Sequence, residues 1–492
     1  MKNLNKFLSL LMMLPLVFHM GMAQKVPLEQ GKSYTLLGLG DSITEGGNNF
    51  SSYLYPLWKK LYLGGYQVEF VGPNQADTKI GGIAHAGFSG RNAAFLATNI
   101  DSLYRQFPAD IVLLHAGHNH FTEENPVEGI VSALTSIVGI IKNVNPEAII
   151  LIAKVIESGK LPKYSYIPQL NERIEQMVSE AQQSYTEIYL VDQAKGFNWK
   201  EDTIEDKVHP NASGAAKMAT IWYEKLETVL EKPSQSFNPT LAVYKKTVSE
   251  ELQLHIFEPS DKFKNDQKAC IIFFFGGGWK VGSPLQFYRE AAYLASKGIV
   301  AISADYRTAF ENGTTPIESL QDAKSAIRWL RKNAQKYGID PSKIAAAGAS
   351  AGGYLAAATG TVEGFEEPEE DHLVSSRPNL NLLYYPVLDL GPDGYDLVEM
   401  KEVYKEISPY YAVNNDTPPT LILLGTEDPY LSVENAKHYK NKLNSMGVGG
   451  ELKLYQGAGH PIFYYRKSPS EYYELMLHET ETFLNKHNYL MK

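Results

Sequence analysis

The sequence predicts an α/β protein made of two consecutive domains, each built on a largely parallel sheet. Short apolar segments alternate with longer helical stretches along most of the chain, the pattern of strands connected through helices. A polar stretch with two prolines, at 232–239, separates two such series. The length of 492 residues is enough for two hydrophobic cores. The two series share no period or motif, which predicts two different folds and not a duplication.

The first series is expected to form a parallel sheet closed by a long helix. The expected strands are 35–39, 68–71, 110–114, 148–153 and 187–191. The closing helix starts near Ser213 and carries Met218, Trp222 and Leu226 at helical spacing. We therefore place the first domain at 24–232 and the linker at 233–243.

The second series, at 244–492, is expected to open with an antiparallel pair and to continue as a parallel sheet. Segments 243–248 and 252–257 are strand-like and are separated by a short polar turn. The strands expected to follow are 269–275, 299–304, 344–347, 381–385, 420–424 and 451–455. Cys270, the only cysteine, falls in the first of these, so we expect a buried structural thiol and no internal disulfide.

The N-terminus has the pattern of a secretory signal peptide over residues 1–23. Lys2 and Lys6 precede an apolar run at 7–18, and small residues come just before Gln24. The alternative is an uncleaved anchor, but the run is well short of the roughly 20 residues that span a bilayer. No cysteine follows as a lipid attachment point. We expect a secreted or periplasmic protein with no membrane span once the signal is removed.

The charge of the chain restricts its partners. The formal net charge is -10, and no run rich in Lys or Arg is present. Nucleic acid is therefore not an expected partner, because its phosphates require a basic face. Neutral substrates fit better, and the composition gives no expectation for the oligomeric state.

A first candidate nucleophile is Ser42, in the segment Gly40-Asp41-Ser42 directly after the first expected strand. A serine hydroxyl is a poor nucleophile at neutral pH, so it needs a base within hydrogen-bond reach and donors for a developing oxyanion. Asp206 precedes His209 by three residues, close enough for the carboxylate to hold one ring nitrogen while the other faces Ser42. His209 is then the expected base.

With these segments in this order, the region from about 33 to 230 resembles the SGNH (GDSL-type) hydrolases. The resemblance rests on Gly40-Asp41-Ser42, Ser89-Gly90-Arg91-Asn92, Gly117-His118-Asn119 and the pair Asp206 and His209. It implies a flavodoxin-like three-layer α/β/α sandwich and a Ser42–His209–Asp206 triad. It also implies that the Gly90 N–H and the Asn119 amide bind the oxyanion.

The chain departs from that family at His120, where Asp is common. His115, His118 and His120 could suggest a metal site. Their alternating positions at a strand end would point them in different directions, however, and no carboxylate accompanies them. We expect no metal and no cofactor.

A second candidate nucleophile is Ser350. The segment 348–352, Gly-Ala-Ser-Ala-Gly, follows an expected strand and precedes a helix-forming stretch. Strand, sharp turn and helix is the arrangement that a nucleophile elbow requires. The Ala351 N–H is an expected oxyanion donor, and Gly277 and Gly278, after an earlier strand, would supply others.

The region from about 244 to 487 resembles the α/β-hydrolase superfamily, and within it the hormone-sensitive-lipase-like and acetyl-esterase-like carbohydrate esterases. The segments that carry the likeness are 276–279, 304–307, 326–331, the elbow and 425–428. The resemblance implies the α/β-hydrolase fold, with Asp428 as the acid and His460 as the base; Glu427 is the adjacent rival for the acid. Phe275 stands where this family usually has His, which weakens the expected support of the oxyanion loop.

Together with the signal-like N-terminus, the two resemblances imply a secreted bifunctional carbohydrate esterase with an acetylated polysaccharide or oligosaccharide as its partner. Each domain would remove acetyl groups, with feruloyl as an alternative acyl group, from a plant-type polysaccharide such as xylan, xyloglucan or pectin. Trp279 and Tyr430 are candidates for acyl or sugar contacts. One alternative is a single active α/β-hydrolase domain with the SGNH domain as a polysaccharide-binding module. The other is a general lipase or small-ester hydrolase, against which neither domain shows an obvious amphipathic lid.

Overall fold

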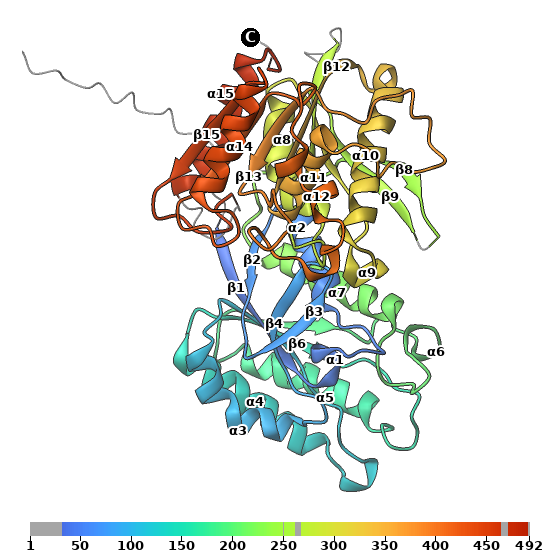
Figure 1. Ribbon diagram of the computed structural model, residues 1–492. Helices are drawn as coiled ribbons and strands as arrows, with labels where there is room; N and C mark the ends of the chain where they lie inside the picture. Colours follow the sequence, from blue (N-terminus) through green and yellow to red (C-terminus); the bar gives the residue numbers. More distant parts are fainter. Residues whose placement is uncertain (1–31, 249, 261–266, 464–470, 491–492) are drawn as a thin grey trace, which may run out of the picture.

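The structure is a computed structural model that describes residues 32–248, 250–260, 267–463 and 471–490. The expected signal peptide, 1–23, lies outside these residues. The chain forms two α/β domains that lie against each other, with the N-terminal domain below and the C-terminal domain above in Figure 1. The predicted fold class, two α/β domains of different topology, is confirmed.

The N-terminal sheet has the strand order β3-β4-β1-β5-β6-β7, with β2 paired to the first half of β1. Its strands are β1 (Ser33–Gly40), β2 (Gln67–Phe70), β3 (Asn74–Thr78), β4 (Gly81–Gly87), β5 (Ile111–His115), β6 (Ile149–Lys154) and β7 (Ile188–Asp192). All its pairings are parallel except the hairpin of β3 and β4. The five predicted strands are present, whereas the β3–β4 hairpin was not predicted.

Helices cover both faces of this sheet because alternate strand residues point to opposite sides. Leu37, Val112 and Ile150 pack under α3 (Ala93–Gln106), α4 (Val127–Val144) and α5 (Ile167–Ala181). Leu36, Leu113 and Leu151 pack under α2 (Leu54–Leu63) and α7 (Ala212–Val229). The result is a three-layer α/β/α sandwich.

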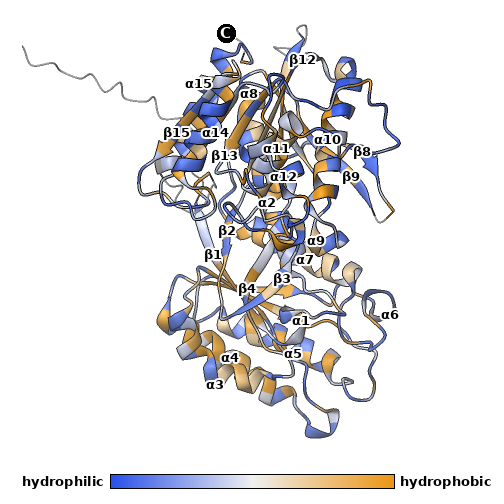
Figure 2. Ribbon diagram, viewed as in Figure 1, coloured by the Kyte–Doolittle hydropathy of each residue, from blue (hydrophilic) through white to orange (hydrophobic). Residues whose placement is uncertain are grey.

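Helix α4 is the one helix among the described residues that is long and apolar enough to cross a membrane. Figure 2 colours much of it as hydrophobic. Half of the helix is buried, and it packs on α3 and α5. Its apolar character is therefore accounted for by the core of the N-terminal domain.

The C-terminal sheet has the strand order β15-β14-β13-β12-β10-β11-β9-β8. Its strands are β8 (Thr240–Lys246), β9 (Glu251–Phe257), β10 (Lys268–Phe274), β11 (Val300–Ala304), β12 (Ile339–Ala349), β13 (Leu380–Tyr384), β14 (Thr420–Gly425) and β15 (Gly450–Tyr455). As predicted, β8 and β9 are antiparallel and the strands from β10 to β15 pair in parallel. Strand β8 starts at Thr240, earlier than expected, because it pairs with β9 from there.

Helices also flank the C-terminal sheet. The longer ones are α8 (Tyr288–Ser296), α10 (Pro316–Lys332), α11 (Ala351–Thr361), α14 (Val433–Ser445) and α15 (Glu471–Lys486). The short α-helices of the described residues, in both domains, are α1 (Ser42–Glu45), α6 (Trp199–Asp202), α9 (Ala309–Asn312), α12 (Tyr404–Ile407) and α13 (Pro409–Ala412). Every residue of β10 is buried, Cys270 included, as expected for a central parallel strand.

The two domains contact each other through α2 and the segment that precedes β8. The Tyr62 hydroxyl donates to the Leu285 carbonyl at 2.6 Å. The Phe237 N–H donates to the Leu63 carbonyl at 2.8 Å, and the rings of Tyr62 and Phe237 stack with centroids 5.8 Å apart. Aromatic packing and hydrogen bonds therefore connect the two domains.

Glu290 on α8 gives the C-terminal domain a pH-dependent stability. Its carboxyl is 2% exposed and accepts a hydrogen bond from the Tyr473 hydroxyl at 2.7 Å. Burial raises the pKa of Glu290 to about 7. The folded chain then holds this proton more tightly than the unfolded chain, so the free energy of unfolding falls as the pH rises from about 4.5 to about 7.

We predict that Glu290→Gln is more stable than wild type by about 3 kcal/mol at pH 8, with no gain at pH 4. The amide carbonyl of Gln can still accept from Tyr473. Urea unfolding of both proteins across this pH range measures the difference, and the exposed Glu224→Gln serves as the control. A difference that does not change with pH would contradict the prediction.

Candidate active sites

Ser42 lies at the carboxyl edge of the N-terminal sheet, where β1 ends and α1 begins. Asp41 caps α1, because its Oδ1 accepts the Ile43 N–H at 3.0 Å. A Cβ on Gly40 would come within 2.4 Å of the His115 carbonyl oxygen, so glycine is needed for the close approach of β1 to β5. The turn therefore presents Ser42 at the edge where ligands bind in open α/β sheets.

The structure brings Ser42, His209 and Asp206 together in a hydrogen-bonded row. Ser42 Oγ lies 2.8 Å from His209 Nε2, and His209 Nδ1 lies 2.5 Å from Asp206 Oδ2. Asp206 Oδ1 accepts the N–H groups of Val208 and His209 at 2.9 and 3.0 Å. Phe50 stacks on the imidazole with centroids 4.2 Å apart. The histidine is thus held between serine and carboxylate, as a base must be.

The charge of Asp206 suits this role. Partial burial raises its pKa, but the hydrogen bonds from His209 and Val208 outweigh burial and leave the pKa below its usual value. Asp206 is therefore a carboxylate at neutral pH. It can fix the imidazole tautomer and stabilise the imidazolium that forms when serine loses its proton.

The two expected oxyanion donors of this site follow the strands on either side of β1. Gly90 comes after β4 and Asn119 after β5, and both have positive φ, +72° and +66°. The Asn119 amide donates to the Arg91 carbonyl at 3.0 Å, which ties the two loops together. The amide has a second hydrogen that can serve an oxyanion.

The neighbouring histidines have other roles. His115 and His118 are buried, and burial lowers their pKa values to about 4 and about 3, so both are neutral at pH 7. His120 instead pairs with Glu124 at 3.0 Å. Among the described residues, no group of three His, Cys, Asp or Glu side chains is placed to hold a metal ion.

Ser350 lies on a strained turn between β12 and α11. Its φ and ψ are 56° and -117°, a conformation that non-glycine residues rarely adopt. Neighbouring glycines permit it: a Cβ on Gly348 would come within 2.2 Å of the Gly352 carbonyl oxygen, and one on Gly352 within 2.0 Å of the Phe274 carbonyl oxygen. This is the geometry of a nucleophile elbow.

A second hydrogen-bonded row contains Ser350, His460 and Asp428. His460 Nε2 lies 3.0 Å from Ser350 Oγ, and His460 Nδ1 lies 2.7 Å from Asp428 Oδ2. Asp428 Oδ1 accepts the N–H groups of Tyr430 and Leu431 at 2.8 and 3.2 Å, and its side chain is fully buried. Of the two neighbouring acids, the structure places Asp428, and not Glu427, against the histidine.

The expected oxyanion donors lie directly after Ser350 and in the loop that follows β10. Ala351 is the first residue of α11, so its N–H has no acceptor within the helix. Gly277 and Gly278 have φ of +136° and +63° in the loop after β10. Gly276 fixes the start of this loop by donating its N–H to Gln286 Oε1 at 2.6 Å.

Phe275 is supported in a way that the sequence did not reveal. Its ring stacks on Tyr306 with centroids 3.9 Å apart, and the Tyr306 hydroxyl donates to the Phe275 carbonyl at 2.7 Å. These contacts support the oxyanion loop at the position where the related family has His.

Aromatic rings surround His460. Tyr385 and Tyr430 both meet its imidazole edge-on, with centroids 4.7 and 4.8 Å away, and Tyr395 packs on Tyr430 at 5.2 Å. Tyr430 is 44% exposed, whereas Trp279 is 2% exposed and packs behind Tyr395. Of the two aromatic residues singled out from the sequence, Tyr430 can therefore contact a ligand directly. Tyr395 was missed because no local motif marks it.

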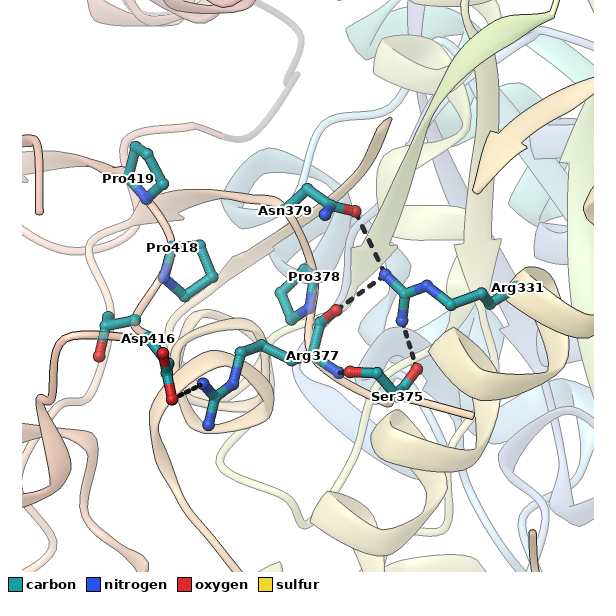
Figure 3. A pocket seen from close by; sticks show the side chains of 9 residues that line it. Arg331, Ser375, Arg377, Pro378, Asn379, Asp416, Pro418 and Pro419 are labelled. Carbon is teal, nitrogen blue, oxygen red and sulfur yellow. Dashed lines mark hydrogen bonds and ion pairs between the residues drawn. The ribbon is translucent and has the colours of Figure 1, made fainter. Parts of the chain in front are cut away.

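A cavity of about 400 Å³ lies away from both serine sites. Figure 3 shows its lining, which includes Arg331, Arg377 and Asp416. These residues precede β12, β13 and β14, whereas Ser350 and Asp428 follow the ends of β12 and β14. The cavity is therefore at the amino end of these strands, away from the carboxyl end that carries Ser350 and Asp428. It takes no part in either hydrogen-bonded row of serine, histidine and aspartate.

Comparison with known proteins agrees with this geometry. Residues 39–217 match the GDSL-like Lipase/Acylhydrolase family, and residues 254–383 match the family described as BD-FAE. The chain is 32% identical over 217 residues to Esterase LipC of Mycobacterium tuberculosis, which covers 39% of this chain and 52% of that protein. It is 25% identical over 214 residues to an acetylxylan esterase of Xylanibacter ruminicola, 40% of this chain and 42% of that protein.

Among solved structures, the apo form of Thermogutta terrifontis esterase 2 is similar to the chain with 37% identity and a TM-score of 0.50; the match covers 54% of this chain and all of that one. The chain spans about half the length of the curated relatives just named. The matches and the fold together support a carboxylic ester hydrolase. The N-terminal domain is thus similar to the GDSL-like acylhydrolases, and the C-terminal domain belongs to the α/β-hydrolase-type esterases.

Proposed function

We propose that the chain is a bifunctional carbohydrate esterase that removes acetyl groups from a plant-type polysaccharide at two independent serine sites. The observation that carries the proposal is the pair of hydrogen-bonded rows, with Ser42 Oγ and Ser350 Oγ 2.8 and 3.0 Å from their histidines. A single chain with two such rows has the groups for two complete hydrolytic reactions.

Each site would run the same two-step reaction. The histidine takes the serine proton as Oγ attacks the ester carbonyl, and then gives that proton to the departing sugar oxygen, which leaves as a free hydroxyl. The carbonyl oxygen becomes an oxyanion held by Gly90 and Asn119 in one site, and by Gly277, Gly278 and Ala351 in the other. A water molecule, deprotonated by the same histidine, then releases acetate from the acyl-serine.

Acetylated polysaccharide is the proposed substrate for three reasons. One relative of the C-terminal domain is an acetylxylan esterase. A net charge of -10 suits a neutral polymer better than an anionic one. Tyr430, half-exposed beside His460, offers a ring face for a sugar or for an aromatic acyl group such as feruloyl. We further propose that the protein is secreted or periplasmic, from the signal-like sequence at 1–23.

The proposal is tested by acetate release from acetylated xylan, xyloglucan and pectin, with feruloylated oligosaccharide and a long-chain lipid ester assayed in parallel. The enzymes are wild type, Ser42→Ala, Ser350→Ala and the double variant. We expect each single variant to lose a different part of the release and the double variant to lose all of it.

The other outcomes separate the alternatives. If Ser42→Ala loses no ester hydrolysis and keeps its affinity for the polymer, the N-terminal domain is a binding module. If the wild type hydrolyses only the lipid ester, the protein is a general lipase. Either result would overturn the bifunctional proposal.

A further inference from the structure

The oxyanion loop of the C-terminal site is strained and needs support. Within residues 276–282, Gly277, Gly278, Trp279 and Gly282 all have positive φ. Trp279 has a φ of +57° and carries a Cβ, so this backbone conformation is sterically unfavourable for it. A loop of this kind keeps its donors in place only if the surrounding structure holds it, and the Phe275 and Gln286 contacts act on its start alone.

The far end of the loop is held by the N-terminal domain. The β3–β4 hairpin belongs to that domain, since β4 pairs with β1. Its turn carries Lys79, whose carbonyl accepts the Gly282 N–H at 2.5 Å. Figure 1 shows the hairpin at the junction between the two domains, near α9. One residue of the GDSL-like domain therefore closes the end of a loop in the other domain.

The Lys79 side chain reaches the same loop by a second route. Its Nζ lies 3.2 Å from Glu311 Oε1 on α9. At the start of α9, the Ala309 N–H donates to the Trp279 carbonyl at 2.9 Å, and the Phe310 N–H donates to the Lys280 carbonyl at 3.0 Å. The ion pair thus holds the short helix that in turn holds the middle of the loop.

From these contacts we infer that Lys79 is a positioning residue for the Ser350 site, supplied by the N-terminal domain. It acts through the loop that carries Gly277 and Gly278, and does not touch the reacting atoms. The inference rests on the proposed function, because it requires hydrolysis at Ser350. It gives a physical reason for joining the domains: the C-terminal oxyanion loop is completed by its neighbour.

The test uses the full chain with Ser42→Ala, so that Ser350 alone hydrolyses p-nitrophenyl acetate. Lys79→Met removes the ammonium but keeps the stem and the carbonyl, and Glu311→Gln removes its partner. We expect each to lower kcat about fivefold with KM changed less than about twofold, because the donors shift more than the binding surface does. The two changes combined should lower kcat no further than either alone.

A second variant removes both the ion pair of Lys79 with Glu311 and the hydrogen bond from the Gly282 N–H to the Lys79 carbonyl. Deleting Lys79 and Ile80 shortens the turn, so the Gly282 N–H also loses its acceptor. We expect kcat to fall about 30-fold or more, approaching the loss of one oxyanion donor. In a Ser350→Ala background, the same deletion should leave hydrolysis at Ser42 within about twofold of its parent, because the turn is at the opposite end of β4 from Gly90.

A matched control is Lys453→Met, whose ion pair with Glu479 is 3.0 Å long and is remote from the loop. It should leave kcat unchanged and shift the melting temperature as much as Lys79→Met does. If all the Lys79 variants keep the parent kcat while Ser350→Ala abolishes it, the positioning role is wrong and the proposed function stands. If Ser350→Ala itself keeps the activity, the proposed function fails.

Discussion

Ser350→Ala, made in a Ser42→Ala background, is expected to lower kcat/KM for p-nitrophenyl acetate about 10⁴-fold or more. Ser350 Oγ is the only hydroxyl placed on His460 among the described residues, at 3.0 Å. Without it, no acyl-serine can form, and the donors alone leave only weak catalysis. Steady-state kinetics with purified full-length protein measure the loss.

The neighbouring acids Asp428 and Glu427 allow a matched pair of substitutions at the same site. Asp428→Asn should lower kcat about 10⁴-fold, because the amide no longer selects the required imidazole tautomer. Glu427→Gln changes an adjacent residue that, among the described residues, has no hydrogen bond or ion pair to His460, and it should leave kcat within about twofold. The exposed Ser342→Ala, far along β12, controls for the serine change. Equal losses in the two acid variants would contradict the assignment of Asp428.

The second large effect is expected at the N-terminal site. With Ser350→Ala as the parent, Ser42→Ala should abolish the remaining ester hydrolysis, a loss of about 10⁴-fold or more. His209 lies 2.8 Å from the Ser42 Oγ and is oriented by Asp206, so the serine is the group that its base activates. Acetate release from acetylated xylan measures the effect on the proposed substrate.

Asn119→Ala tests the oxyanion site independently of the triad. It should lower kcat about 10²- to 10³-fold, the usual cost of losing one donor. Ser102→Ala, on the exposed face of α3, should have no effect. If Ser42→Ala and Asn119→Ala both retain the parent activity, the N-terminal domain is not hydrolytic.

Much of the fold could be predicted because its strands are buried on both faces. Central strands such as β5 and β10 are continuous apolar segments, and each candidate serine comes directly after a segment of this kind. The β3–β4 hairpin was not predicted because β3 is not a continuous apolar segment. Strand β3 reads Asn-Gln-Ala-Asp-Thr, has no buried residue and is paired on an edge of the sheet.

The residues of the candidate sites were likewise predictable only where a local sequence pattern marks them. Ser42, Asp206 and His209 are marked by short motifs, and Ser350 by its glycines. The supports of the second site are not: Gln286 and Lys79 lie in segments with no recognisable pattern, and the family-like segment 304–307 does not reveal which contact Tyr306 makes. They reach the oxyanion loop only through tertiary packing, so their roles follow from the structure alone.

Active-site labelling tests the central claim, two separate serine sites in one chain, most directly. A fluorophosphonate reacts covalently with activated serines, and intact-mass spectrometry counts the adducts on the full chain. We predict two adducts on wild type, one on Ser42→Ala, one on Ser350→Ala and none on the double variant. A single adduct on wild type that disappears with one of the two substitutions would contradict the claim.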